Sequence, residues 1–158
     1  MFRKSILTLT IVLGILPALP MTAQTMARSE NGAKANLTVT LTGIRNDKGQ
    51  VFIQLWNAPE GFPKRAEKAY KYVAIEASKA VKGAVTTTFA DLAPGTYAVS
   101  TLHDENGNGR MDTGAFGIPK EGWAVSNNVV THAHAPSYEN ASFVLPPTGQ
   151  TIVIALHY

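Results

Sequence analysis

The 158-residue sequence contains no cysteine, so no disulfide can stabilise the folded chain. Its fold must therefore depend on a buried apolar core, with or without a bound ion. Runs of basic residues are also missing, because the densest cluster, Lys64 to Lys71, is interrupted by Glu67 and is typical of a solvated face. We therefore expect no nucleic-acid partner.

Several catalytic signatures are missing as well. The chain has no Gly-x-Ser-x-Gly, no His-Glu-x-x-His and no phosphate-binding glycine loop. Asp104 and Glu121 are two acids near each other in the chain, but such pairs are common and do not identify a reaction. The sequence favours a protein without catalytic activity.

The N-terminus predicts export. Arg3 and Lys4 precede an apolar run from Ser5 to Leu19, and small residues follow. This pattern predicts a signal peptide over residues 1–27, too short and too early for a membrane span. Its removal lowers the formal charge from +3 to +1, since two of the 14 basic residues leave and all 11 acids stay. We expect a periplasmic or secreted protein without an integral membrane segment, with a flexible segment over 28–35 and one domain over 36–158.

Apolar and polar residues alternate along most of that domain, as they do in strands with one buried face. Turn signals separate the strands at Asn46–Gly49, Pro94–Gly95 and Pro146–Gly149. The expected strands cover 37–42, 50–56, 71–79, 83–89, 96–103, 139–145 and 151–156. Seven short strands without a long helix predict an all-β fold, an antiparallel seven-stranded β-sandwich.

One long Gly/Asn/Pro-rich loop, over residues 104–136, interrupts this pattern. Compact domains seldom contain so long a loop unless it is functional or holds an ion. Its first part has oxygen-bearing residues at alternate positions, as in a calcium loop. Asp104, Asn106, Asn108 and Asp112 occupy positions 1, 3, 5 and 9, Gly109 occupies the glycine position 6, and Arg110 offers its carbonyl at position 7.

The loop departs from a full calcium site at position 12, where Ala115 replaces the usual bidentate glutamate. Only two carboxylates remain, so calcium as cofactor would bind weakly, at roughly millimolar concentration, unless Glu121 completes the shell. The competing interpretation is that Asn-Gly-Asn-Gly forms a tight turn without any ion, because these residues tolerate positive φ.

The histidines allow two interpretations. His103 lies in phase with the apolar face of its strand, which favours a buried hydrogen-bonding brace over a metal ligand. His132 and His134 are spaced two apart, so on a strand they would share a face and could bind a metal with His103 or Glu139. In a loop they would instead be exposed to solvent. Asn127 and Asn128 are expected to satisfy loop backbone groups.

Four segments carry a resemblance to known families. The segment 89–99, Phe-Ala-Asp-Leu-Ala-Pro-Gly-Thr-Tyr-Ala-Val, resembles the strand-turn-strand signature of prealbumin-like sandwich modules. The segments 103–112, 116–122 and 126–128 resemble a bacterial exported family, domain of unknown function number twenty-one forty-one, over about residues 37–158. The resemblance implies an exported prealbumin-like or Ig-like sandwich and no activity. It implies nothing for His132 and His134, which lie where the family has a Gly/Pro-rich segment.

Together these features predict an exported non-catalytic binding or structural module with a weak calcium-binding loop. The alternative is a small periplasmic metal-dependent hydrolase that uses His103, Asp104 and Glu121. A third possibility is a cell-envelope or carbohydrate-binding surface, which would need exposed aromatic side chains close together. Its candidates are Trp56, Trp123, Tyr138 and Tyr158.

Overall fold

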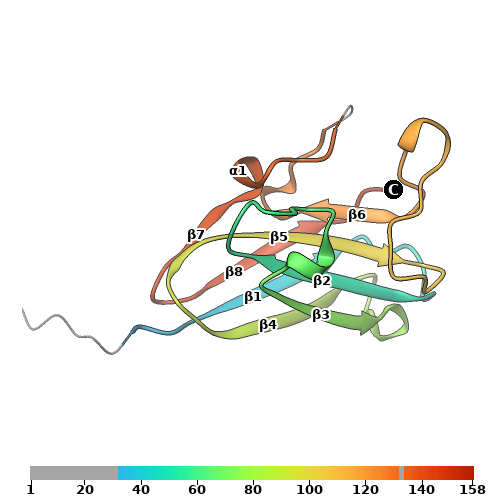
Figure 1. Cartoon of the computed structure of the whole chain (residues 1–158). Helices are drawn as coiled ribbons and strands as arrows, with labels where there is room; N and C mark the ends of the chain where they lie inside the picture. The colour runs from blue at the N-terminus through green and yellow to red at the C-terminus, as the bar shows by residue number, and fades with distance from the viewer. Residues whose placement is uncertain (1–31, 132–133) are drawn as a thin grey trace, which may run out of the picture. The chain divides into compact units, whose positions relative to one another are not determined.

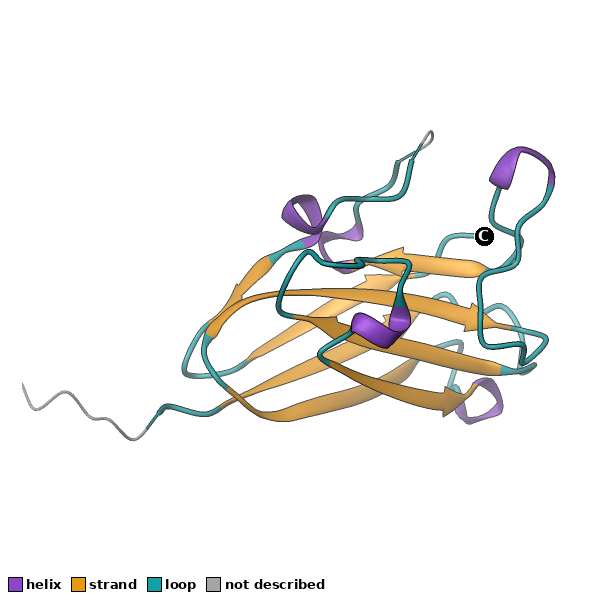
Figure 2. Ribbon diagram, viewed as in Figure 1, coloured by secondary structure: helices purple, strands orange, loops and turns teal. Residues whose placement is uncertain are grey.

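The computed structural model of the chain describes residues 32–131 and 134–158. The expected signal peptide over 1–27 and residues 28–31 of the expected flexible segment lie outside the described residues. The described residues form eight strands (Figures 1 and 2). They are β1 (Ala35–Thr42), β2 (Gln50–Trp56), β3 (Lys71–Glu76), β4 (Val85–Leu92), β5 (Gly95–Asp104), β6 (Gly122–Val125), β7 (Phe143–Leu145) and β8 (Gln150–Ala155).

The strands form two sheets, which confirms the predicted all-β sandwich (Figure 1). One sheet has the order β4-β1-β8 and the other the order β3-β2-β5-β6, with β7 joined to the beginning of β5. Two details of the prediction were wrong. The strands number eight among the described residues, and β1 pairs with β8 in parallel rather than antiparallel.

Each error has a physical reason. β6 has only four residues and lies inside the Gly/Asn/Pro-rich loop, where a period of two cannot be recognised. The expected strand over 139–145 begins instead as a short helix, α1 (Tyr138–Ala141), whose first turn is capped by the Ser137 side chain. Whether β8 runs parallel or antiparallel to β1 depends on which strands are neighbours in the sheet. The alternation of residues within one strand does not indicate its neighbours.

The main core lies between the two sheets. The inward residues of β1 face those of β2, and all of them are fully buried: Leu37, Val39, Leu41, Val51, Ile53 and Leu55. Burying each such side chain contributes about 1.5–3 kcal/mol relative to leaving it exposed. On the outer face, Thr38 and Thr40 of β1 bond with Thr88 and Thr86 of β4 at 3.0 and 3.1 Å, so the threonines cross-link neighbouring strands.

A second, smaller cluster contains Trp56, Ala98, Val125 and Ala141, with Phe62 and Tyr138 packed against it. Trp56 meets Phe62 edge to face at a centroid distance of 5.5 Å, and its indole nitrogen donates to Ser100 at 2.9 Å. β2 and β5 thus contribute side chains to both clusters.

β5 is the central strand of the larger sheet, and it determines where the candidate site lies. Its register pairs His103 with Val51 on one side and with Gly122 on the other, and it pairs Asp104 with Gln50. The last two residues of β5 are therefore fixed by neighbouring strands before the loop begins. The loop that follows Asp104 therefore begins at a backbone position that the sheet holds in place.

Candidate functional site at the end of the central strand

Asp104 organises the turn that follows β5. Its side chain is buried, and its Oδ1 accepts hydrogen bonds from the backbone N–H groups of Gly107 at 2.8 Å and Asn108 at 3.1 Å. Its Oδ2 accepts one from the N–H of Gly109 at 2.7 Å. Gly107 and Gly109 have φ of 73° and 77°, a backbone conformation that glycine adopts without strain. The turn chemistry predicted for Asn-Gly-Asn-Gly is thus present, with Asp104 at its centre.

The other predicted ligands converge on Asp112. The side-chain amide of Asn106 donates to one oxygen of Asp112 at 2.7 Å, and that of Asn108 donates to the other at 2.9 Å. The amide oxygens of Asn106 and Asn108 accept the backbone N–H groups of Asn108 and Arg110 at 3.1 and 3.0 Å. Of the five predicted residues, three therefore meet through their side chains, while Arg110 joins through its backbone.

Glu121 joins the two ends of this loop. Its side chain is buried, and its two oxygens accept the N–H groups of Glu105 and Asp112, each at 2.9 Å. The sequence suggested Glu121 as an additional oxygen donor to an ion. In the structure both of its oxygens bind backbone groups on either side of the loop, so Glu121 determines the width of the loop at its base.

A second cluster of contacts surrounds His103, which is fully buried. Its Nε2 lies 2.9 Å from the carbonyl oxygen of Lys48, which can only accept, so Nε2 carries the proton. In the neutral ring Nδ1 then accepts from the Tyr158 hydroxyl at 2.6 Å. Both ring nitrogens are used within the fold, which confirms the predicted hydrogen-bonding brace.

Tyr158 and Arg45 complete this cluster. The sequence named Tyr158 only as a candidate for an exposed aromatic surface, and it did not indicate Arg45. The Tyr158 ring packs against Gly122, where a Cβ would lie 2.5 Å from its Cζ, and burial raises the pKa of its hydroxyl. The Arg45 guanidinium lies 4.1 Å above the same ring and donates to both oxygens of Glu105, at 2.5 and 2.9 Å. These hydrogen bonds lower the pKa of Glu105, and they raise the pKa of Arg45.

Two buried carboxylates of this region form no ion pair in the described chain. Glu105 is paired with Arg45, whereas neither Asp104 nor Glu121 forms an ion pair within the part of the chain that the structure describes. Both are compensated there by backbone N–H groups. Within residues 32–131 and 134–158, no group of three or more His, Asp or Glu side chains is arranged to hold a metal ion.

The remaining candidates lie apart from this region. His132 lies outside the described residues, and His134 is exposed with its Nδ1 3.0 Å from the carbonyl oxygen of Ala135. Trp56 and Tyr138 belong to the second cluster, and the Trp123 ring lies 6.1 Å from that of His157. Asn127 and Asn128 bond to backbone groups, as predicted.

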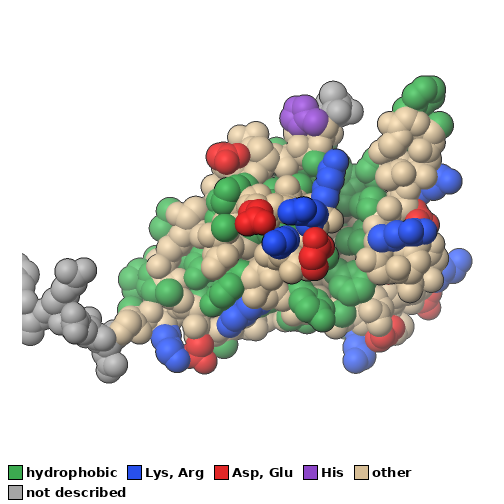
Figure 3. Space-filling model, viewed as in Figure 1, with side chains coloured by type: hydrophobic (Ala, Val, Ile, Leu, Met, Phe, Trp, Pro, Cys, Tyr) green, Lys and Arg blue, Asp and Glu red, His purple; other side chains and the backbone are tan. Residues whose placement is uncertain are grey.

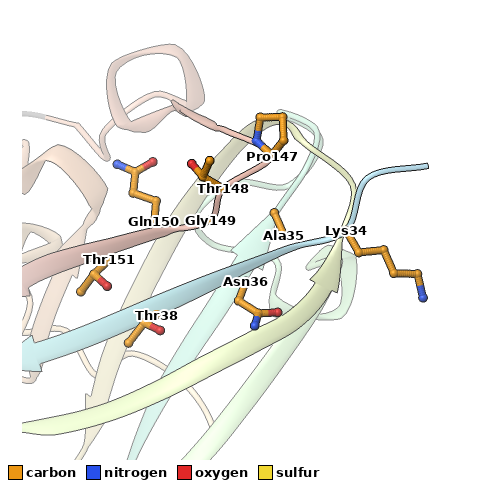
Figure 4. Close-up of a pocket in the computed structure, with 9 residues that line it drawn as sticks. All are labelled: Lys34, Ala35, Asn36, Thr38, Pro147, Thr148, Gly149, Gln150 and Thr151. Carbon is orange, nitrogen blue, oxygen red and sulfur yellow. The ribbon is translucent and has the colours of Figure 1, made fainter. Parts of the chain in front are cut away.

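Two open hollows on the surface lie apart from this region. The first lies where β1 and β8 begin, and Figure 4 shows the polar side chains around it. Its lining comprises Lys34, Ala35, Asn36, Thr38, Pro147, Thr148, Gly149, Gln150 and Thr151. The second lies beside β3 and β4 and includes Ile75, Lys79 and Val85. His103, Asp104 and Glu121 line neither hollow.

The comparisons with known proteins identify a family. The model of the family described as "Uncharacterized protein conserved in bacteria (DUF2141)" matches residues 39–153, so the chain belongs to that family. No curated protein and no solved structure gives a significant match. None of the described helices is long and apolar enough to cross a membrane.

Proposed function

We propose that this member of the DUF2141 family is an exported, non-catalytic β-sandwich module whose loop over residues 104–112 binds a calcium ion weakly. One observation carries the proposal. Asp104 and Glu121 are buried carboxylates that form no ion pair in the described chain, and they flank a loop in which the side chains of Asn106, Asn108 and Asp112 converge. A cation beside them would offset buried negative charge.

The same contacts explain why the affinity should be low. In the ion-free arrangement the side-chain N–H groups of Asn106 and Asn108 occupy both oxygens of Asp112. To bind calcium, these amides must turn their oxygens toward the ion, which breaks the bonds that those oxygens accept from backbone N–H groups. The missing glutamate at Ala115 removes two further ligand atoms. Binding at roughly millimolar calcium is the range of extracellular sites of this kind.

The non-catalytic part of the proposal is supported by His103. Its two ring nitrogens are bound to Tyr158 and Lys48 within the fold, and the ring is fully buried. A general base needs a nitrogen that can reach a substrate. No contact described above favours the alternative of a metal-dependent hydrolase built on His103, Asp104 and Glu121.

Thermal unfolding in calcium and in chelator tests the proposal. We expect the unfolding temperature to rise with calcium concentration from millimolar CaCl2 upward, relative to EGTA. An ion that binds the folded state alone stabilises it by about 0.4 kcal/mol when its concentration equals the dissociation constant, and by more at higher concentration. An equal concentration of MgCl2 is the ionic-strength control. An unchanged unfolding temperature at millimolar calcium would contradict the calcium loop.

Substitutions then assign the effect to this loop. The Asp112→Asn variant should lose the calcium-dependent shift with little change in EGTA, because the bonds of its carboxylate go to two exposed amides. Asp104→Ala should lose the shift and also unfold at a lower temperature in EGTA. Asp91→Asn removes an exposed carboxylate near the opposite end of β5 and should keep the full shift. A shift that survives Asp112→Asn would place the ion elsewhere.

A further inference from the structure

The segment Thr113–Pro119, here called the finger, extends away from the sandwich (Figures 1 and 2). Thr113 and Pro119 form an antiparallel bridge at its base, and the N–H of Gly114 donates to the carbonyl oxygen of Ile118 at 2.7 Å. Just below, the N–H of Lys120 donates to the carbonyl oxygen of Asp112 at 2.9 Å. The finger is therefore a hydrogen-bonded projection with a defined backbone.

The end of the finger is apolar and exposed to solvent. Phe116 is 101% exposed and Ile118 is 63% exposed. Figure 3 shows the hydrophobic side chains at the end of the projection. Phe116 is the most exposed large hydrophobic residue in the part of the chain that the structure describes. Exposed apolar residues that cluster often mark an interaction site.

The backbone holds Phe116 in this position at a cost. Its φ is 60°, a left-handed conformation in which a bulky side chain is strained. Gly117 follows with φ of 74°, and the bonds from Gly117 to Gly114 and from Ile118 to Ala115 close the turn. At the base, Glu121 binds the N–H of Asp112. These bonds oppose a collapse of the phenyl ring onto the sandwich.

Basic side chains lie below the apolar end. Arg110 and Lys120 are both exposed. The stem of Lys120 runs along the finger, since a Cβ on Gly114 would lie 3.2 Å from its Cε. Asp112 is the single acid between residues 106 and 120, and both of its oxygens accept side-chain amide bonds. The exposed charges that flank the finger are therefore mainly basic, whereas Asp104 and Glu121 at its base are buried and Glu105 is paired with Arg45.

We propose that the finger inserts Phe116 and Ile118 into the surface of a bilayer that contains anionic lipids. The apolar side chains would enter the boundary between headgroups and acyl chains, while Lys120 and Arg110 would contact lipid phosphates. A narrow convex projection can insert into a lipid bilayer because the bilayer deforms around it, whereas a protein partner would need a pocket of matching shape. The charge distribution favours a lipid surface over a second copy of this chain, whose finger would carry the same basic charge.

Co-sedimentation of the full chain with vesicles tests this inference. We expect binding to vesicles of phosphatidylcholine mixed with phosphatidylglycerol, weaker binding to phosphatidylcholine alone, and a loss of binding as salt increases. All measurements are made in EGTA. Failure of the calcium proposal, read from thermal unfolding, is therefore distinguishable from failure of this one.

Matched variants locate the contact. The double substitution Phe116→Asn with Ile118→Thr should lower the vesicle partition coefficient at least about tenfold. Asparagine tolerates the left-handed backbone, so the finger should keep its shape. The control Val144→Thr alters a residue of β7 that is 69% exposed and should leave the partition coefficient unchanged. Because the N-terminal segment is identical in all variants, it cannot produce a difference between them.

Two outcomes would overturn the inference. One is that the wild type and the double variant bind vesicles equally, or that neither binds them. The second of these results is expected if the finger docks into a protein pocket. The other comes from the Phe116→Trp variant, whose added fluorescence should be quenched by brominated lipids when the finger inserts. Trp56 and Trp123 supply the background, which is measured in the wild type. If the variant binds vesicles but the fluorescence added by its new tryptophan is not quenched, another surface of the protein makes the contact.

Discussion

At the scale of single residues, Arg45 connects three parts of the chain that are distant in sequence. It donates to Glu105 just after β5, covers the ring of Tyr158, and reaches the carbonyl oxygen of Lys120 at 3.3 Å. One side chain therefore joins the end of the central strand to the base of the finger. Because the Arg45 hydrogen bonds lower the pKa of Glu105, this connection depends on pH.

The sign of that dependence follows from the lowered pKa. A carboxyl group that is more acidic in the folded chain contributes stability above its unfolded pKa of 4.5, and this contribution is lost as the pH falls through the folded value. In a double-mutant cycle of Arg45→Gln and Glu105→Gln, the coupling free energy from urea denaturation should be favourable at pH 7 and fall toward zero well below pH 4.5. Coupling that stays constant across this range would refute the assignment.

At the scale of elements, β8 is an edge strand that a side chain protects. β8 pairs with β1 on one side only, and on the other side Asn128 imitates a neighbouring strand. Its Oδ1 accepts the N–H of Ala155 at 2.9 Å, and its Nδ2 donates to the carbonyl oxygen of Val153 at 3.3 Å. Unpaired edge groups invite pairing with another chain, and Asn128 occupies two of them.

Removal of this side chain should expose the edge. Asn128→Gly keeps the positive φ of 50° accessible while it frees the groups on Ala155 and Val153. We expect concentration-dependent dimers or larger species in light scattering. The control Asn127→Gly removes the adjacent amide, which bonds instead to the carbonyl oxygens of Asn140 and Ser142, and should remain as monomeric as the wild type. If both variants behave alike, the edge protection is not specific to Asn128.

The sequence predicted those strands in which apolar and polar residues alternate over their full length. β1 and β2 appear where alternation predicted them, because each buries one complete face. β6 and α1 were missed because four residues are too few to establish a period. The oxygen-bearing residues after Asp104 were found by their spacing, whereas Arg45 and Tyr158 join the same region through contacts across 60 and 55 residues. Long-range contacts of this kind leave no pattern in one sequence.

At the scale of the whole molecule, stability rests on the core between the two sheets, because the chain has no disulfide. Ile53 lies in that core on β2 and is fully buried. We expect Ile53→Ala to lower the free energy of unfolding by about 2–5 kcal/mol, as lost apolar burial and a cavity add together. Urea denaturation measures the change.

The matched control for that measurement is Val153→Ala. Val153 is 58% exposed on β8, so its truncation should change the free energy of unfolding by less than about 0.5 kcal/mol. A cost for Ile53→Ala as small as that of the control would mean that the sheets are not held together at this point.

The clamp that Glu121 makes at the base of the loop has a practical consequence. Because its two oxygens hold the N–H groups of Glu105 and Asp112, the anchoring of the projection does not depend on which side chains its far end carries. A foreign peptide epitope grafted between Gly114 and Gly117 would thus be displayed at a fixed position, on a scaffold with no thiols to oxidise.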